Sequence, residues 1–190
     1  VCPYYINPKS QRAGLRVLVG KGDPGEIGRE VKVHSQLKGI DLQKLSEEGI
    51  RQFMLDNHIG IDCSGLVVHT YNYWLKNEDK RPLIKYLKFK NNGFIARLKR
   101  KMRPVEQIGA NTLTNEENTK IIRDLNKVRP GDFIRSKGLR RNSHHIMIIS
   151  EVTIVDENVE EIEYTHSIKG YNEENGLRFG KILISDPKLP

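Results

Sequence analysis

Apolar residues recur at helical spacing in two stretches of the first half of the chain. The first stretch predicts a helix over 40–57, interrupted at Gly49. Its apolar positions are Leu42, Leu45, Ile50, Phe53 and Met54. The second stretch follows Asp62, a good N-cap residue, and runs through apolar positions to Leu75. It predicts a mostly buried helix with Cys63 in its first turn.

The last third of the chain has the pattern of strands. A turn over 129–132 precedes a strand that begins at Phe133, and 145–155 is rich in β-branched residues. The segment 159–167 alternates, and 178–185 predicts a further strand. Since the helices come first and the strands follow, we expect an α+β fold with N-terminal helices packed on a small antiparallel sheet.

Two further stretches connect these elements. Residues 1–39 are rich in glycine and turn residues, which predicts loops around a short apolar run. Residues 76–128 are mostly polar and predict two short helices, 94–102 and 115–126. Because the second stretch has few large apolar residues, we expect an insertion on a single domain of 1–190 rather than a second core.

The net charge of +8 comes from one part of the sequence. Residues 76–103 hold eleven Lys or Arg against two acids, whereas 151–163 hold six acids and no base. Such a basic surface favours an anionic partner, either nucleic acid, anionic lipid or an anionic wall polymer. A solvated face without a partner explains the same charges. The sequence has no apolar run of the roughly 18 residues that a membrane span needs.

The chemistry-bearing candidates are one cysteine and three histidines. Cys63 at a helix start would have its thiol pKa lowered by the helix, and a nearby imidazole would lower it further. His145 and His166 lie on predicted strands; His144 is the alternative to His145, on the opposite face of the strand. A zinc site of Cys63 with the three histidines has suitable ligand types but lacks a short ligand spacing. A Cys2–Cys63 disulfide would disable the nucleophile.

Several motifs resemble those of the NlpC/P60 cysteine peptidases. The segment 61–67, Ile-Asp-Cys-Ser-Gly-Leu-Val, is similar to the nucleophile motif of that family. The segment 129–134 resembles the Pro-Gly-Asp turn before the histidine strand, and 145–148 resembles the start of that strand. The segment 164–167 resembles the strand that carries the orienting residue, and Pro3-Tyr4-Tyr5 is similar to an upstream Pro-Tyr segment.

The resemblance implies a papain-like core and hydrolysis of an amide in peptidoglycan stem peptides. Cys63 would attack the carbonyl, His145 would act as general base and acid, and His166 would orient His145. Tyr4, Asp62 and Ser64 would contact the substrate, Tyr4 as an oxyanion donor and the other two at the substrate amine. The family's reaction needs no metal or cofactor.

The chain departs from the family in its spacing. It lacks the usual Gly-Gly after the upstream tyrosine, and 82 positions separate Cys63 from His145. We therefore expect insertions at about 9–57 and 76–128 that reshape the cleft. Since the chain begins at Val1 rather than Met, we expect a processed or excised piece of a secreted or cell-envelope protein. Two other hypotheses remain: a basic binding module with a non-catalytic Cys63, and an amidase or acyltransferase with the same triad.

Overall fold

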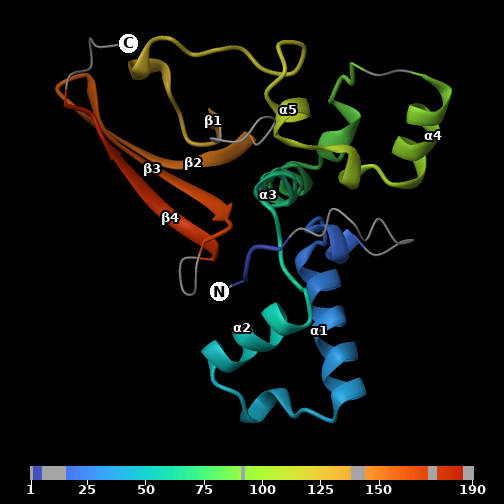
Figure 1. Ribbon diagram of the computed structural model, residues 1–190. Helices are drawn as coiled ribbons and strands as arrows, with labels where there is room; N and C mark the ends of the chain where they lie inside the picture. The colour runs from blue at the N-terminus through green and yellow to red at the C-terminus, as the bar shows by residue number, and fades with distance from the viewer. Residues whose placement is uncertain (1, 6–15, 91–92, 138–143, 171–174, 186–190) are drawn as a thin grey trace.

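A four-stranded antiparallel sheet forms one side of the molecule (Figure 1). The computed structural model describes residues 2–5, 16–90, 93–137, 144–170 and 175–185. The strands β1 (Phe133–Lys137), β2 (His144–Val155), β3 (Asn158–Ile168) and β4 (Gly176–Leu183) lie side by side in chain order. Each pairs antiparallel with the next, so the α+β class and the antiparallel sheet are confirmed.

The helix α3 (Cys63–Asn77) packs against β2 and β3 and lies in the centre of Figure 1. It begins where the sequence predicts, because the Asp62 carboxylate accepts a hydrogen bond of 2.5 Å from the backbone N–H of Gly65. Its buried face joins the largest core cluster of the described residues. That cluster contains Cys63, Val67, Val68, Val105, Ile108, Ala110, Leu113, Ile146 and Ile148.

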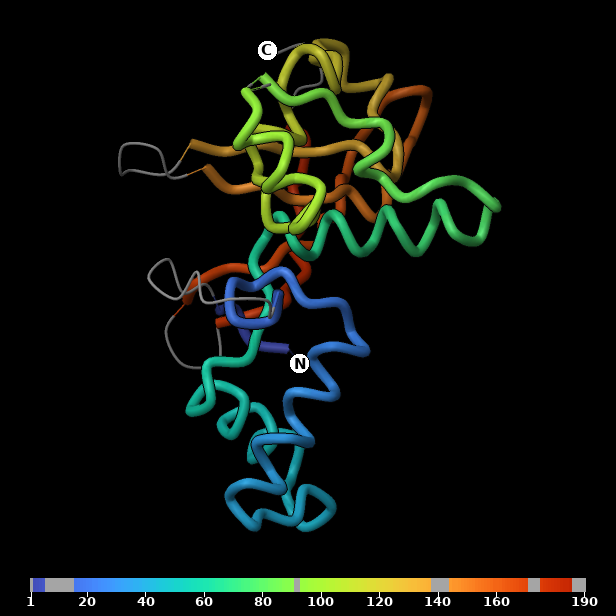
Figure 2. The backbone as a smooth tube through the Cα atoms, turned by 90° about the vertical axis from the view of Figure 1, so that its right-hand side faces the viewer, coloured from blue at the N-terminus to red at the C-terminus, as the bar shows by residue number. Residues whose placement is uncertain are grey.

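Two helices lie below α3 in Figures 1 and 2, namely α1 (Pro24–Lys38) and α2 (Glu47–Asp56). The prediction of loops over 1–39 is wrong for α1. A reciprocal capping box between Asp23 and Glu26 starts this helix, and Gly39 in a left-handed conformation ends it. The helix predicted over 40–57 is shorter, because Ser46 caps α2 and the preceding residues form a 3-10 turn (Leu42–Lys44).

In the described part of the segment 76–128, the helices are α4 (Phe94–Met102) and α5 (Ala110–Leu113). This segment also has 3-10 turns at Leu83–Lys85, Val105–Gln107 and Leu125–Lys127, and another 3-10 turn lies near the N-terminus at Arg16–Val19. The bounds of α4 match the prediction.

The helix predicted over 115–126 is wrong. The side chains of Asn115 and Asn118 bond to nearby backbone, with Glu117 N–H donating to Asn115 over 2.7 Å and Asn118 donating to the Thr112 carbonyl over 2.7 Å. These bonds favour turns over a helix. Across the described ranges, the structure has no helix long and apolar enough to cross a membrane.

Candidate active site

The start of α3 is attached to the end of the β2–β3 pair that is remote from the hairpin turn. The first paired residues at this end are Ile148 and Thr165, and His145 and His166 lie just beyond them. There the buried hydroxyl of Ser167 donates a 2.7 Å hydrogen bond to the carbonyl of Ile61. This bond fixes the residues just before Cys63 against β3.

The thiol of Cys63 faces strand β2. Cys63 is 8% exposed, and the backbone of Ile146 hydrogen-bonds its sulfur. The sulfur therefore lies beside the peptide bond that joins His145 to Ile146. In the described part of the chain, no hydrogen bond joins this sulfur to the His145 ring. Apo cysteine sites often have such loose geometry before substrate binds.

His145 and His166 form a hydrogen-bonded pair. His145 Nε2 lies 2.8 Å from His166 Nδ1, and the two rings meet edge to face at 5.0 Å between centroids. When Nε2–H of His145 is the donor, its Nδ1 carries a lone pair and can accept a proton. In that tautomer, Nδ1 is the basic nitrogen of the His145 ring.

Both histidines are held in the neutral form. Burial, with a smaller contribution from the charge of His166, lowers the pKa of His145 to about 4. Burial and the charge of Arg178 lower the pKa of His166. A neutral imidazole at physiological pH is the form that a general base requires.

The pKa of the Cys63 thiol is raised, contrary to the expectation from its helix position. Burial is the largest cause, and the negative charge of Asp62 adds to it. Hydrogen bonds from the backbone of Ile146 and Ser64, and the positive charge of Lys21, oppose the increase. The resting residue is therefore a neutral thiol, and an attack on a carbonyl requires a base to take its proton.

Sequence reasoning missed Lys21, which lies beside the start of α3. Its side chain is buried, and its ammonium lies 2.9 Å from each oxygen of the Asp62 carboxylate and 3.0 Å from the carbonyl oxygen of Ile108. It also bonds to the hydroxyl of Ser64. Asp62 and Ser64 are themselves only 5% and 3% exposed. The two residues expected at the substrate amine thus already bind an internal ammonium.

The N-terminal segment brings Tyr4 to the site across more than fifty positions of sequence. The carbonyl of Pro3 accepts a 3.0 Å hydrogen bond from Ile61 N–H, and the carbonyl of Cys2 accepts a 3.1 Å bond from Leu177 N–H at the start of β4. Burial raises the pKa of Tyr4, and the charges of Asp62 and Cys63 raise it further. The Tyr4 phenol is therefore protonated and able to donate a hydrogen bond near Cys63.

Two glycines permit this close assembly. The carbonyl of Gly20 accepts a 2.9 Å hydrogen bond from Asp62 N–H, and a Cβ on Gly65 would lie 2.4 Å from that carbonyl oxygen. Gly20 itself has a φ of +71°. A residue larger than glycine at position 65 would push the first turn of α3 away from Gly20, so the packing requires Gly65.

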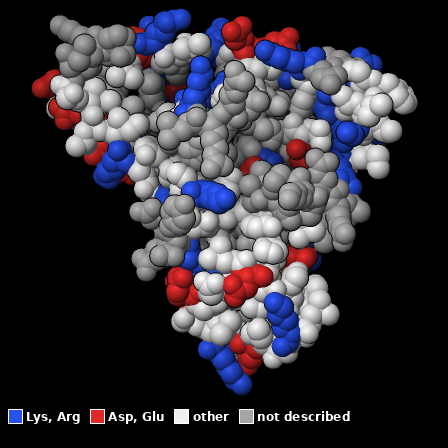
Figure 3. Space-filling model, viewed as in Figure 1, with Lys and Arg blue, Asp and Glu red and all other residues white. Residues whose placement is uncertain are grey.

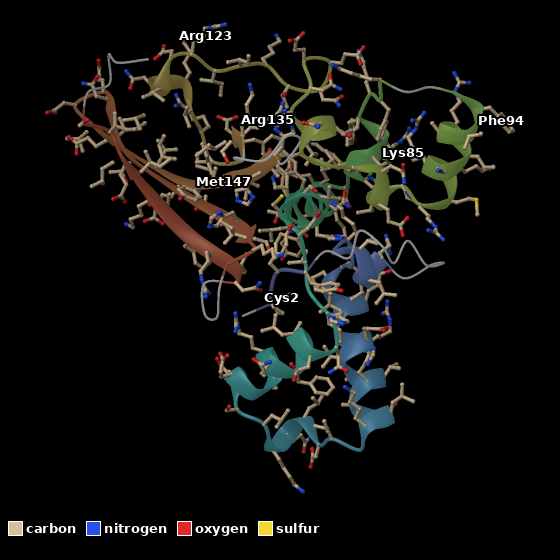
Figure 4. The ribbon with its side chains drawn as sticks, viewed as in Figure 1. Cys2, Lys85, Phe94, Arg123, Arg135 and Met147 are labelled. Carbon is tan, nitrogen blue, oxygen red and sulfur yellow. The ribbon has the colours of Figure 1, made fainter. Side chains whose placement is uncertain are left out.

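Three alternatives from the sequence are His144 in place of His145, a Cys2–Cys63 disulfide and a zinc site, and none has a supporting contact among the described residues. His144 Nδ1 is buried without a partner among the described residues, and His144 does not join the histidine pair. Both cysteines are free; Cys2 lies on the segment below α3 and packs in a different cluster (Figure 4). In the part of the chain that the structure describes, no group of three or more His, Cys, Asp or Glu is placed to hold a metal ion.

Two cavities lined by described residues lie away from the candidate site. Pockets of about 840 and 480 Å³ share Tyr71, Gly131, Asp132 and Ile149 and include none of the candidate site residues. Comparison with known proteins adds no assignment: no protein-family model, curated protein or solved structure matches the chain.

Proposed function

We propose that this chain is a cysteine hydrolase of the papain-like NlpC/P60 type that cleaves an amide bond in peptidoglycan stem peptides. The observation that carries the proposal is the hydrogen-bonded pair of His145 and His166 at the strand end where α3 presents Cys63. A thiol at a helix start, near the strand end that carries a neutral imidazole paired with a second histidine, supplies the residue types of a Cys-His-polar triad.

The reaction follows from the protonation states. His145 Nδ1 takes the proton from the Cys63 thiol as the sulfur attacks the carbonyl carbon, and a tetrahedral oxyanion forms. The backbone N–H of Cys63 and the protonated Tyr4 phenol are the donors available to that oxyanion. His145 then gives its proton to the leaving amine, which leaves a thioester on Cys63. Water, deprotonated by His145, hydrolyses the thioester and restores the thiol.

His166 acts through His145 rather than on the substrate. When His166 Nδ1 is the acceptor of this hydrogen bond, His145 carries its proton on Nε2, and its Nδ1 is left unprotonated. Its own neutral state keeps positive charge away from His145, since burial and Arg178 both lower its pKa. His166 is therefore a positioning residue.

Incubation with a panel of purified stem peptides tests the proposal. Mass spectrometry should find one new amino end and one new carboxyl end, and Cys63→Ser should abolish both while His144→Ala retains them. Turnover of simple activated amides or esters alone would support the same-triad hydrolase or acyltransferase and reject the wall substrate. Absence of any Cys63-dependent turnover would contradict the proposal and favour the binding module.

A further inference from the structure

The helix α4 presents its apolar side chains to solvent. Phe94, Ile95, Leu98 and Met102 are 82%, 69%, 48% and 71% exposed. At 3.6 residues per turn these four positions fall within an arc of about 100°, so they form one continuous apolar face. Figure 4 shows Phe94 projecting away from the body of the molecule.

The opposite face of α4 attaches it to the protein. Ala96 and Arg100 are the half-buried residues of this helix, and the Arg100 guanidinium lies 4.7 Å from the centre of the Phe89 ring. After the helix, Val105 and Ile108 enter the main core at 6% and 0% exposure. The helix is therefore held from its polar side, with its apolar face turned outward, the reverse of a helix that packs on a core.

Positive charge surrounds the apolar face. Lys99 and Lys101 border the arc on its two sides, and residues 83–103 hold eight Lys or Arg and no acid. Three of these, Lys85, Lys88 and Lys90, are exposed on the segment that leads to the helix. Figure 3 shows the Lys and Arg side chains gathered over the region of α4, with uncharged side chains at its outer edge.

We propose that α4 is a membrane-surface anchor that lies in the headgroup layer of an anionic lipid bilayer. The apolar face of about 13 Å length enters the boundary of the acyl chains, and the bordering lysines and arginines contact lipid phosphates. A nucleic acid or wall polymer would use the charges but would gain little from four exposed apolar side chains. An anionic bilayer matches both, because apolar burial and charge attraction act on the same nine residues. The proposal does not depend on the active site.

Vesicle flotation tests it on the full chain. Vesicles that mix phosphatidylcholine with phosphatidylglycerol should bind the protein at least about tenfold more strongly than phosphatidylcholine alone, and added salt should weaken binding. The double variant Phe94→Ser/Ile95→Ser should lose about tenfold or more of this binding. The matched control is Phe179→Ser/Leu183→Ser on β4, whose side chains are 76% and 75% exposed and should leave binding unchanged.

Three results would overturn the proposal. Equal binding to vesicles with and without phosphatidylglycerol would show that charge attraction to lipid does not contribute. Unchanged vesicle binding by the Phe94/Ile95 variant shows that charges act alone, as for a polymer. If the wild type forms a dimer, the variant dissociates it and neither protein binds vesicles, the apolar face contacts a second copy of the chain instead. Unchanged thermal midpoints of the variants establish that all of them are folded.

Discussion

The substitution Lys21→Met tests whether the buried ion pair beside Cys63 is as tightly integrated as its contacts indicate. Lys21 is 5% exposed, and its ammonium contacts the Asp62 carboxylate, the Ser64 hydroxyl and the Ile108 carbonyl. Methionine retains much of the side-chain volume but removes the charge. The Asp62 carboxylate would then remain buried without its counter-ion.

The magnitude follows from that unpaired charge. Removal of one partner of a buried ion pair costs about 3 to 5 kcal/mol of the free energy of unfolding. For a chain of this size each kcal/mol corresponds to about 2 to 4 °C in Tm, so the expected loss is about 6 to 20 °C. The double variant Lys21→Met/Asp62→Asn should recover more than half of the loss, because asparagine still caps α3 through Gly65 N–H but carries no charge.

Urea unfolding followed by circular dichroism measures these differences. The matched control is Lys181→Met, since Lys181 also contacts two carboxylates, Glu161 at 2.9 Å and Glu163 at 2.7 Å, but is exposed. The control should change the urea midpoint little. A Lys21→Met variant within about 1 kcal/mol of the wild type, or a double variant less stable than the single one, would refute the reasoning.

Three further outcomes follow from the same site. Gly65→Ala should destabilise the fold by about 2 kcal/mol or more in urea unfolding, because its Cβ would meet the Gly20 carbonyl. The control Gly28→Ala, on the open face of α1, should stabilise the fold by about 0.5 to 1 kcal/mol. The pKa of His145 is about 4 in the native state and 6.5 in the unfolded state, so the unfolded state binds more protons between these two pH values. The free energy of unfolding should therefore fall as pH decreases through this window, and His145→Gln should flatten that slope. Tyr4→Phe should lower kcat by about tenfold or more with an unchanged Tm, and an unchanged kcat would exclude the phenol as an oxyanion donor.

The sequence was sufficient for the elements that local signals define. Asp62 caps a helix whose first residue is Cys63, a run rich in β-branched residues marks β2, and alternation marks β3. The glycines Gly25 and Gly28 favour a loop over α1, whereas the start signals of Asp23, Pro24 and Glu26 form the capping box that begins this helix.

The parts of the site that depend on long-range contacts were less predictable. Lys21 reaches Asp62 across 41 positions and Ile108 across 87, and no local pattern marks such a lysine as buried. The pairing of His145 with His166 was predicted from a family resemblance, and the structure places their rings in hydrogen-bond contact. The helix start predicts a lowered pKa for the Cys63 thiol, but burial and the charge of Asp62, which depend on the tertiary structure, raise it.

The most direct test of the central claim is the acylation of Cys63 by p-nitrophenyl acetate, resolved by peptide mass spectrometry. Cys2 is the internal reference, because it is free, half-buried, and has a pKa that burial raises to about 11. We expect the acylation rate of Cys63 to stay level from about pH 5 to 8, since His145 is neutral above about pH 4 and the thiol is still protonated.

His145→Ala should slow the acylation of Cys63 by about a hundredfold near pH 6 and leave Cys2 unaffected, while His144→Ala should change neither rate by more than about threefold. In the His145 variant the remaining rate at Cys63 should instead rise about tenfold per pH unit, as for an unassisted thiol. Acylation of Cys63 that is slower than that of Cys2 in the wild type and indifferent to His145 would contradict the account.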